Sequence, residues 1–425
     1  MPVSRLKFDS LPHAIFLQRV TAQSPATSLE ARLGQGAFLA LRLVDLLAAD
    51  REPVASDAFH YQWIATDRFC RELRAAATEG AHVHGIAASA ADAHRLNDRR
   101  MIAPTLLAYG HYLEDALRLD EALDVLWTLV QVGGVQLSSP DAVAVRLRLA
   151  RVNRKLNRFD EAEVAYTEAG ELATVAGDRY SELLSRIGRA YATTGRGNLA
   201  EAERILGGVL ADAEAGAGAD RDAAALAHQA LAVVLSTGGR PVEAIPHEWR
   251  AFQLYEDGSS RMRVLSDLAV MLLTVGEVDG AERALNEIVR HGATRDVLDN
   301  ALIELMHCAS YRRDRVGFER WREQCDARRE SMPPNMLVEF MLKAGIGRAR
   351  FGQLDRAERL LASALRIADE AGLHEFTFRI ERIKAGLRDS CQSPNERPAE
   401  AADPVVQSEA VREVSAGLAH LAGAT

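Results

Sequence analysis

Two stretches of the chain, LRLDEALDVLWTLV (117–130) and LNRFDEAEVAYTEA (156–169), follow one pattern of small and apolar residues. A third copy, FGQLDRAERLLASA, occupies residues 351–364. Each copy has a small residue at its centre and a larger apolar residue four positions later. Apolar residues spaced by three, four and seven positions indicate an amphipathic helix, and this spacing continues along most of the chain after residue 28. The sequence therefore predicts a helical repeat.

Aligning the copies on the central small residue reveals seven units at intervals of 37 to 42 residues. The aligned positions are Ala122, Ala162, Ala202, Ala244, Ala281, Phe318 and Ala357, with Phe318 marking a degenerate copy. Asn, Gly, Asp and Arg precede these positions and favour a tight corner between two helices. Each unit is predicted to be helix, short turn, helix and linker.

This pattern resembles the tetratricopeptide repeat, whose second helix carries A-x-x-x-F-x-x-A. The best matches are Tyr109-Gly110 with Leu113, then Ala162 with Tyr166 and Ala169, and finally Ala357 with Leu361 and Ala364. The units are longer than the family's usual period of about 34 residues. They are similar to the long-helix arrays of bacterial regulators such as the maltose-operon activators. The resemblance implies an all-α fold, a right-handed α-solenoid of helical hairpins.

The alignment divides the chain into four segments. Residues 1–27 are expected to be a loosely structured lead, and residues 28–100 a helical cap, one or two degenerate repeats that begin at the helix-capping residue Ser28. Residues 101–388 form the predicted array of about seven repeats. Residues 389–425 are predicted to be a disordered linker and tail with a short helix over 406–421.

Composition excludes several classes of function. The net charge is −9, which gives no reason to expect direct nucleic-acid binding. Lysines are few (Lys7, Lys155, Lys343 and Lys384), and none lies in a phosphate-binding G-K-[ST] motif. The N-terminus has no clear leader and no apolar run is long enough to span a membrane, so a bacterial cytoplasmic protein is expected.

No pattern of catalytic or metal-binding residues emerges. The four cysteines are far apart, and His82 and His84 are spaced so that they would not share a helix face. We therefore expect no catalytic residues, no metal and no cofactor. An enzyme with an unrecognised helical site is the least favoured alternative.

The resemblance implies a ligand groove lined by the first helix of each unit. Basic residues gather there around the second unit, and Arg pairs well with carboxylates. The candidate groove residues are Arg151, Arg154, Lys155, Arg189, His111 and Gln229. They predict a clamp for an acidic segment or a C-terminal carboxylate. Charge reversal of Arg151 and Arg154 is expected to abolish binding of the partner and to leave the melting temperature unchanged. A solvated surface offset by Glu161, Glu163 and Glu168 is the alternative interpretation.

The sequence thus favours a scaffold or adaptor that binds a protein or peptide. The alternative is a ligand- or peptide-sensing regulator that acts through a partner chain. Self-association through the cap or the tail is left open.

Overall fold

The structure, a computed structural model, describes residues 11–22, 27–48, 56–215, 220–392 and 408–423. Within these ranges all regular elements are helices, as the sequence predicts. The chain divides into two compact units, Met1–Val209 and Leu210–Thr425, which we describe separately. None of the described helices combines the length and apolar character needed to cross a bilayer.

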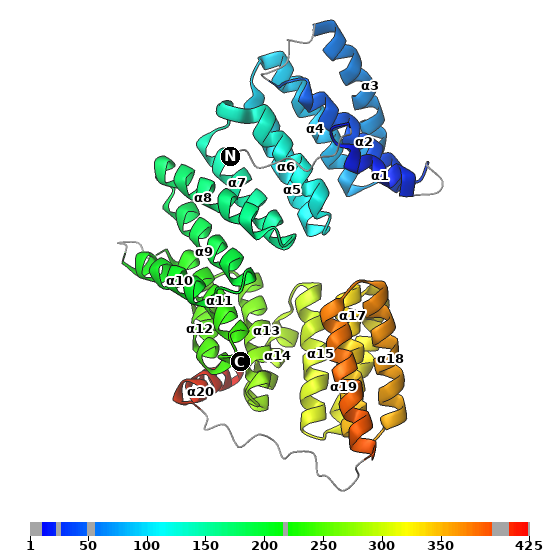
Figure 1. The fold of residues 1–425 in the computed structure, drawn as a ribbon, viewed down its shortest axis with the longest axis vertical. Coiled ribbons are helices and arrows are strands. Elements are labelled where there is room, and N and C mark those ends of the chain that lie inside the picture. Colours follow the sequence, from blue (N-terminus) through cyan, green and yellow to red (C-terminus); the bar gives the residue numbers. More distant parts are fainter. Residues whose placement is uncertain (1–10, 23–26, 49–55, 216–219, 393–407, 424–425) are drawn as a thin grey trace. The chain divides into compact units, whose positions relative to one another are not determined.

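In the first unit, consecutive helices form antiparallel pairs (Figure 1). The helices are α1 (Ala14–Ala22), α2 (Leu29–Asp45), α3 (Ser56–Arg74), α4 (Thr78–Leu96), α5 (Ala103–Asp115), α6 (Leu119–Gly133), α7 (Ser139–Lys155), α8 (Phe159–Ala176) and α9 (Arg179–Gly195). The next helix, α10 (Leu199–Glu214), contains the division between the units. Ser28 caps α2 as expected, because its hydroxyl accepts a hydrogen bond from the backbone of Ala31.

The second unit continues the alternation of first and second helices. Its helices are α11 (Arg221–Thr237), α12 (Pro241–Leu254), α13 (Gly258–Thr274), α14 (Val278–His291), α15 (Arg295–Tyr311), α16 (Arg315–Arg328), α17 (Pro334–Arg350), α18 (Leu354–Glu370), α19 (His374–Gln392) and α20 (Glu409–Gly423). Successive first helices contact one another, as α7 does with α9 and α15 with α17, so each unit has a face built from first helices.

The structure confirms the register of the seven repeats. All seven aligned residues lie in second helices and are completely buried: Ala122, Ala162, Ala202, Ala244, Ala281, Phe318 and Ala357. Five residues before each of them, the chain adopts a positive φ, at Leu117, Asn157, Gly197, Gly239, Gly276, Arg313 and Gly352. A residue in this left-handed conformation ends the first helix and turns the chain into the second.

Small residues allow the two helices of a hairpin to approach closely. A Cβ atom on Gly110 of α5 would lie 2.9 Å from Cδ2 of Leu126 in α6. The equivalent pair in the last hairpin is Gly345 and Leu361, where the distance would be 3.0 Å. Repeat positions that resemble the tetratricopeptide pattern therefore make the contact between the paired helices.

First helices are more regular than second helices. Each of α7, α9, α11, α13, α15 and α17 has 17 residues. Second helices vary, with 18 residues in α8 and 14 in α14. The unequal repeat intervals therefore arise after the hairpin turn, in the second helices and the connectors.

Residues 1–27 are more ordered than expected where the structure describes them. Helix α1 packs on α2, and Phe16 is completely buried. His13 bonds to Asp124, and its Nε2 atom lies 3.3 Å from Asp45. The prediction of a loose lead is therefore wrong for α1, because these contacts to α2 and α6 are distant in sequence.

A buried ionic network extends the attachment of α1. Arg19 bonds to Glu121 and, at 2.9 Å, to Glu79 of α4. Arg118 bonds to the same two carboxylates. Tyr109 of α5 donates a hydrogen bond of 2.7 Å to Glu79. Side chains from four helices thereby meet at one interior site, where each charge has an opposite charge beside it.

The C-terminal tail returns to the middle of its unit. The helix predicted over 406–421 is observed as α20, which packs on α12 and α14 (red in Figure 1). Val411, Val414 and Leu418 are buried in this interface. The linker prediction differs in part, because α19 extends to Gln392, and residues 393–407 lie outside the described residues.

Candidate ligand-binding face

Three of the basic residues on α7 converge on one buried carboxylate. Glu114, near the end of α5, has no exposed surface. Its oxygens lie 2.7 Å from Arg148, 2.6 Å from Arg151 and 2.8 Å from Lys155. Burial alone would raise the pKa of Glu114, but its bonds to Lys155 and Arg148 and the charge of Arg151 hold it below its ordinary value. We call this group the Glu114 cluster.

The Glu114 cluster changes the interpretation of two candidates. Arg151 and Lys155 are brought together, but they are already bonded to a carboxylate of this chain. Three cations facing one carboxylate still leave a local excess of positive charge. The repeat pattern places Glu114 on the first helix of the preceding repeat but does not identify it as the partner of these cations.

Arg154 and Arg189 retain unused hydrogen-bonding capacity. The guanidinium of Arg154 lies 5.2 Å from the ring centroid of Tyr191 in α9. Arg189 of α9 lies 3.8 Å from Glu163, a distance longer than a hydrogen bond. The Nε atoms of both arginines are buried and have no hydrogen-bond partner among the described residues. These donors lie on two first helices that contact each other.

Two further basic residues, Arg146 on α7 and Arg158 in the turn after it, are paired with acids of neighbouring helices. Arg146 bonds to Glu168 at 2.7 Å, and Arg158 bonds to Asp120 at 2.9 Å. The offset by Glu168 agrees with the solvated-surface interpretation. Among the predicted arginine and lysine residues of the groove, Arg154 and Arg189 are the two with a buried Nε atom that has no hydrogen-bond partner among the described residues.

His111 and Gln229 bond to other partners. His111 is exposed on α5, and its ring lies 2.9 Å from Asp115 on the same helix. Gln229 belongs to the second unit, where it accepts a hydrogen bond of 3.2 Å from the hydroxyl of Tyr255. Of the predicted residues, the Glu114 cluster brings together Arg151 and Lys155.

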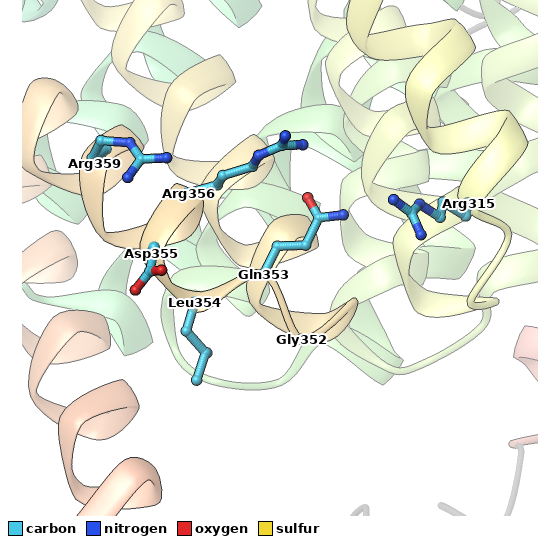
Figure 2. A pocket seen from close by; sticks show the side chains of 7 residues that line it. All are labelled: Arg315, Gly352, Gln353, Leu354, Asp355, Arg356 and Arg359. Atoms are coloured by element: carbon cyan, nitrogen blue, oxygen red, sulfur yellow. The ribbon is translucent and has the colours of Figure 1, made fainter.

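The second unit has a basic surface pocket at the turn between α17 and α18. It is lined by Arg315, Gly352, Gln353, Leu354, Asp355, Arg356 and Arg359. Figure 2 shows the side chain of Gln353 between those of Arg356 and Arg315. The arginines are exposed, and Asp355 places a negative charge among them. This open pocket contains none of the predicted groove residues.

Among the described residues, no three His, Cys, Asp or Glu side chains are grouped so that they could hold a metal ion. Cys70, Cys308 and Cys325 are buried free thiols, and burial raises the pKa of each to about 12. Thiols in this state are poor nucleophiles.

Comparisons with known proteins concern the fold. No family model and no curated protein matches the chain. The chain is similar to the solved structure of a Rap protein complexed with competence and sporulation factor (13% identity, 87% of this chain and 99% of that chain, TM-score 0.42). It is also similar to NprR in complex with its cognate peptide NprX (11% identity, 80% and 86%, TM-score 0.44). The tetratricopeptide domain of P58(IPK) is a further match (13%, 86% and 99%, TM-score 0.24).

The helices, the positive-φ turns and the buried repeat positions of the described residues form an array of helical hairpins that follows the tetratricopeptide-like pattern of the sequence.

Proposed function

We propose that this chain binds a peptide or protein segment through the first helices of its hairpins, without covalent chemistry. The observation that carries this proposal is the pair of buried, unbonded Nε–H groups of Arg154 and Arg189. A buried donor without a partner is costly, so a ligand acceptor at these positions would recover the lost hydrogen bonds.

The ligand group that suits these donors is a carboxylate, from an acidic side chain or a C-terminus. Arginine donates to carboxylates in a planar, charge-assisted arrangement. The excess positive charge of the Glu114 cluster would add long-range attraction for the same group. In this proposal Arg154 and Arg189 contact the ligand, whereas Arg151 and Lys155 hold Glu114 and contribute charge.

Two of the similar solved structures are complexes, one with a cognate peptide and one with competence and sporulation factor. In our proposal, this chain likewise binds a peptide. A scaffold and a sensor differ in the consequence of binding. In a sensor, the bound peptide would change the affinity of this chain for a second protein.

The test uses pooled octapeptides labelled with fluorescein, one pool with free C-terminal carboxylates and one with C-terminal amides. Fluorescence anisotropy should report tighter binding of the free-acid pool to the wild-type chain. Arg154→Gln/Arg189→Gln should abolish this preference, because it removes both unbonded donors. Arg204→Gln on α10 is the matched control, since Arg204 is exposed and bonds to Glu201 of its own helix.

Equal binding of both pools by wild-type protein, or an unchanged preference in the double variant, would overturn the proposal. Circular dichroism of each variant separates a loss of binding from a loss of helix. Arg151→Glu is unsuitable here, because it would set a second carboxylate against the buried Glu114.

A further inference from the structure

Three arginines line the surface pocket at the turn between α17 and α18. Arg315 is the first residue of α16, and Arg356 and Arg359 lie three positions apart on α18, on the same face of that helix. All three side chains are exposed. Their guanidinium groups make no ion pair and no hydrogen bond with any residue that the structure describes.

Other arginines of the same two helices are paired with acids. Arg322 of α16 lies 2.8 Å from Glu319, and Arg366 of α18 lies 2.7 Å from Glu370. At the pocket, the only acid among the lining residues is Asp355. Three positive charges and one negative charge leave two positive charges without compensation.

Gln353 adds a hydrogen-bond donor whose orientation is fixed. Its Oε1 atom accepts a hydrogen bond of 3.0 Å from Arg348, and Glu319 in turn holds Arg348 at 2.9 Å. The amide nitrogen of Gln353 is therefore the group left to face the pocket, on the side of Arg315 (Figure 2). The figure also shows the guanidinium groups of Arg356 and Arg315 directed toward each other, with Gln353 between them.

A side-chain contact joins the two sides of the pocket. Arg313, in the turn before α16, donates a hydrogen bond to the carbonyl oxygen of Arg350 at the end of α17. Helix α17 also packs on α16 and on α18. The beginnings of α16 and α18 are therefore held close to each other, and donors from both helices can act on one ligand group.

We propose that this pocket binds the phosphate group of a phosphate monoester. Such a group carries close to two negative charges at neutral pH, which match the two uncompensated positive charges. Its three terminal oxygens accept hydrogen bonds from several directions, as donors on two helices require, whereas a carboxylate presents two oxygens in one plane. The pocket has a volume of about 480 Å³, which leaves room for the group that carries the phosphate. The site uses neither Arg154 nor Arg189 and does not depend on binding there.

Isothermal titration calorimetry of the full chain at pH 7.5 tests the proposal. The peptide Gly-Ala-phosphoserine-Ala-Gly, with acetyl and amide caps, represents a phosphorylated protein, and methyl phosphate represents a small metabolite. The tighter of the two identifies the source of the phosphate group. Dimethyl phosphate, which carries a single negative charge, and the unphosphorylated serine peptide should give no measurable binding.

Substitutions in the pocket should change the affinity without unfolding the protein. Each of Arg315→Gln, Arg356→Gln and Arg359→Gln removes one donor that has no partner in the chain, and each should weaken monoester binding about fivefold. Asp355→Asn removes the competing negative charge and should tighten binding about threefold. Arg366→Gln removes the same charge from α18 outside the pocket and is the matched control, with unchanged affinity expected.

The proposal is overturned if neither monoester gives a measurable heat, or if dimethyl phosphate or the unphosphorylated peptide binds as tightly as the monoesters. It is also overturned if the variant with all three arginines replaced binds as well as wild type. Arg154→Gln/Arg189→Gln should bind the monoesters normally, so failure of this proposal and failure of the proposed carboxylate recognition are distinguishable.

Discussion

The hydroxyl of Tyr109 donates a hydrogen bond of 2.7 Å to Oε1 of Glu79, and both side chains are buried where α1, α4, α5 and α6 meet. Tyr109→Phe removes one donor and leaves Glu79 with its two arginines. We expect the free energy of unfolding to fall by about 1–3 kcal/mol. Urea denaturation measures the change. Tyr61→Phe, at an exposed tyrosine of α3, should not alter the midpoint.

His13 should make stability depend on pH in the alkaline range. Burial lowers the pKa of His13, but the bonds to Asp124 and Asp45 outweigh burial and raise the pKa from 6.5 to about 9. The stabilising charge is therefore fully present below pH 6.5 and is lost as pH rises through 9. The contribution is on the order of 3 kcal/mol.

His13→Asn tests this dependence, since Asn tolerates the positive φ at this position. The stability difference between wild type and variant should be large at pH 6 and small at pH 10 in urea unfolding. A constant difference across that range would contradict the proposed role of His13. The exposed His60→Asn should follow the wild-type pH profile.

The Glu114 cluster predicts a destabilising substitution that a second substitution compensates. Arg151→Glu places a carboxylate beside the buried Glu114 and should lower the free energy of unfolding by about 2 kcal/mol. Adding Glu114→Gln should restore most of that loss, because the repulsion disappears. A double-mutant cycle by chemical denaturation measures the coupling. Additive effects of the two changes would show that these residues do not interact.

The conformation of Leu117 predicts a stabilising substitution. Leu117 has a φ of 58° at a turn where four of the seven equivalent residues are glycine. Because the side chain is exposed and makes the left-handed conformation costly, Leu117→Gly should raise the free energy of unfolding by about 1 kcal/mol. Leu96→Gly, at the end of α4, should instead destabilise the protein. Thermal melts of both variants provide the comparison.

Gly417 predicts how α20 is held. A Cβ atom there would lie 2.6 Å from Cζ2 of Trp249 in α12, so Gly417→Val should dislodge α20. Hydrogen exchange measured by mass spectrometry should increase in α20, α12 and α14. Ala416→Val introduces the same residue on the exposed side of α20 and is the control. If both variants exchange alike, the close contact of Gly417 is not what retains the helix.

The repeat was predictable because its determinants are local. The buried alanines, such as Ala122 and Ala357, recur in sequence at the same place in each hairpin. The turn conformations depend on residues a few positions away. Ion pairs between side chains of neighbouring repeats were not predictable in this way. The pair of Glu114 with Arg148 is the clearest example.

Buried acids were missed for a related reason. Charged residues on helices usually face solvent, so a glutamate without exposed surface, such as Glu248 on α12, leaves no signal in the sequence. Likewise, nothing local to α1 indicates its attachment to α6.

The constant length of six first helices has a consequence for the evolution and engineering of this chain. If repeats are exchanged at the connectors, each inserted repeat contributes a first helix of the same length followed by the same kind of turn. New ligand-contacting residues could then be introduced into one first helix at a time, while the neighbouring first helices keep their length. Replacing another first helix and its turn residues with residues 139–157 would transfer the charge pattern of α7 to that repeat.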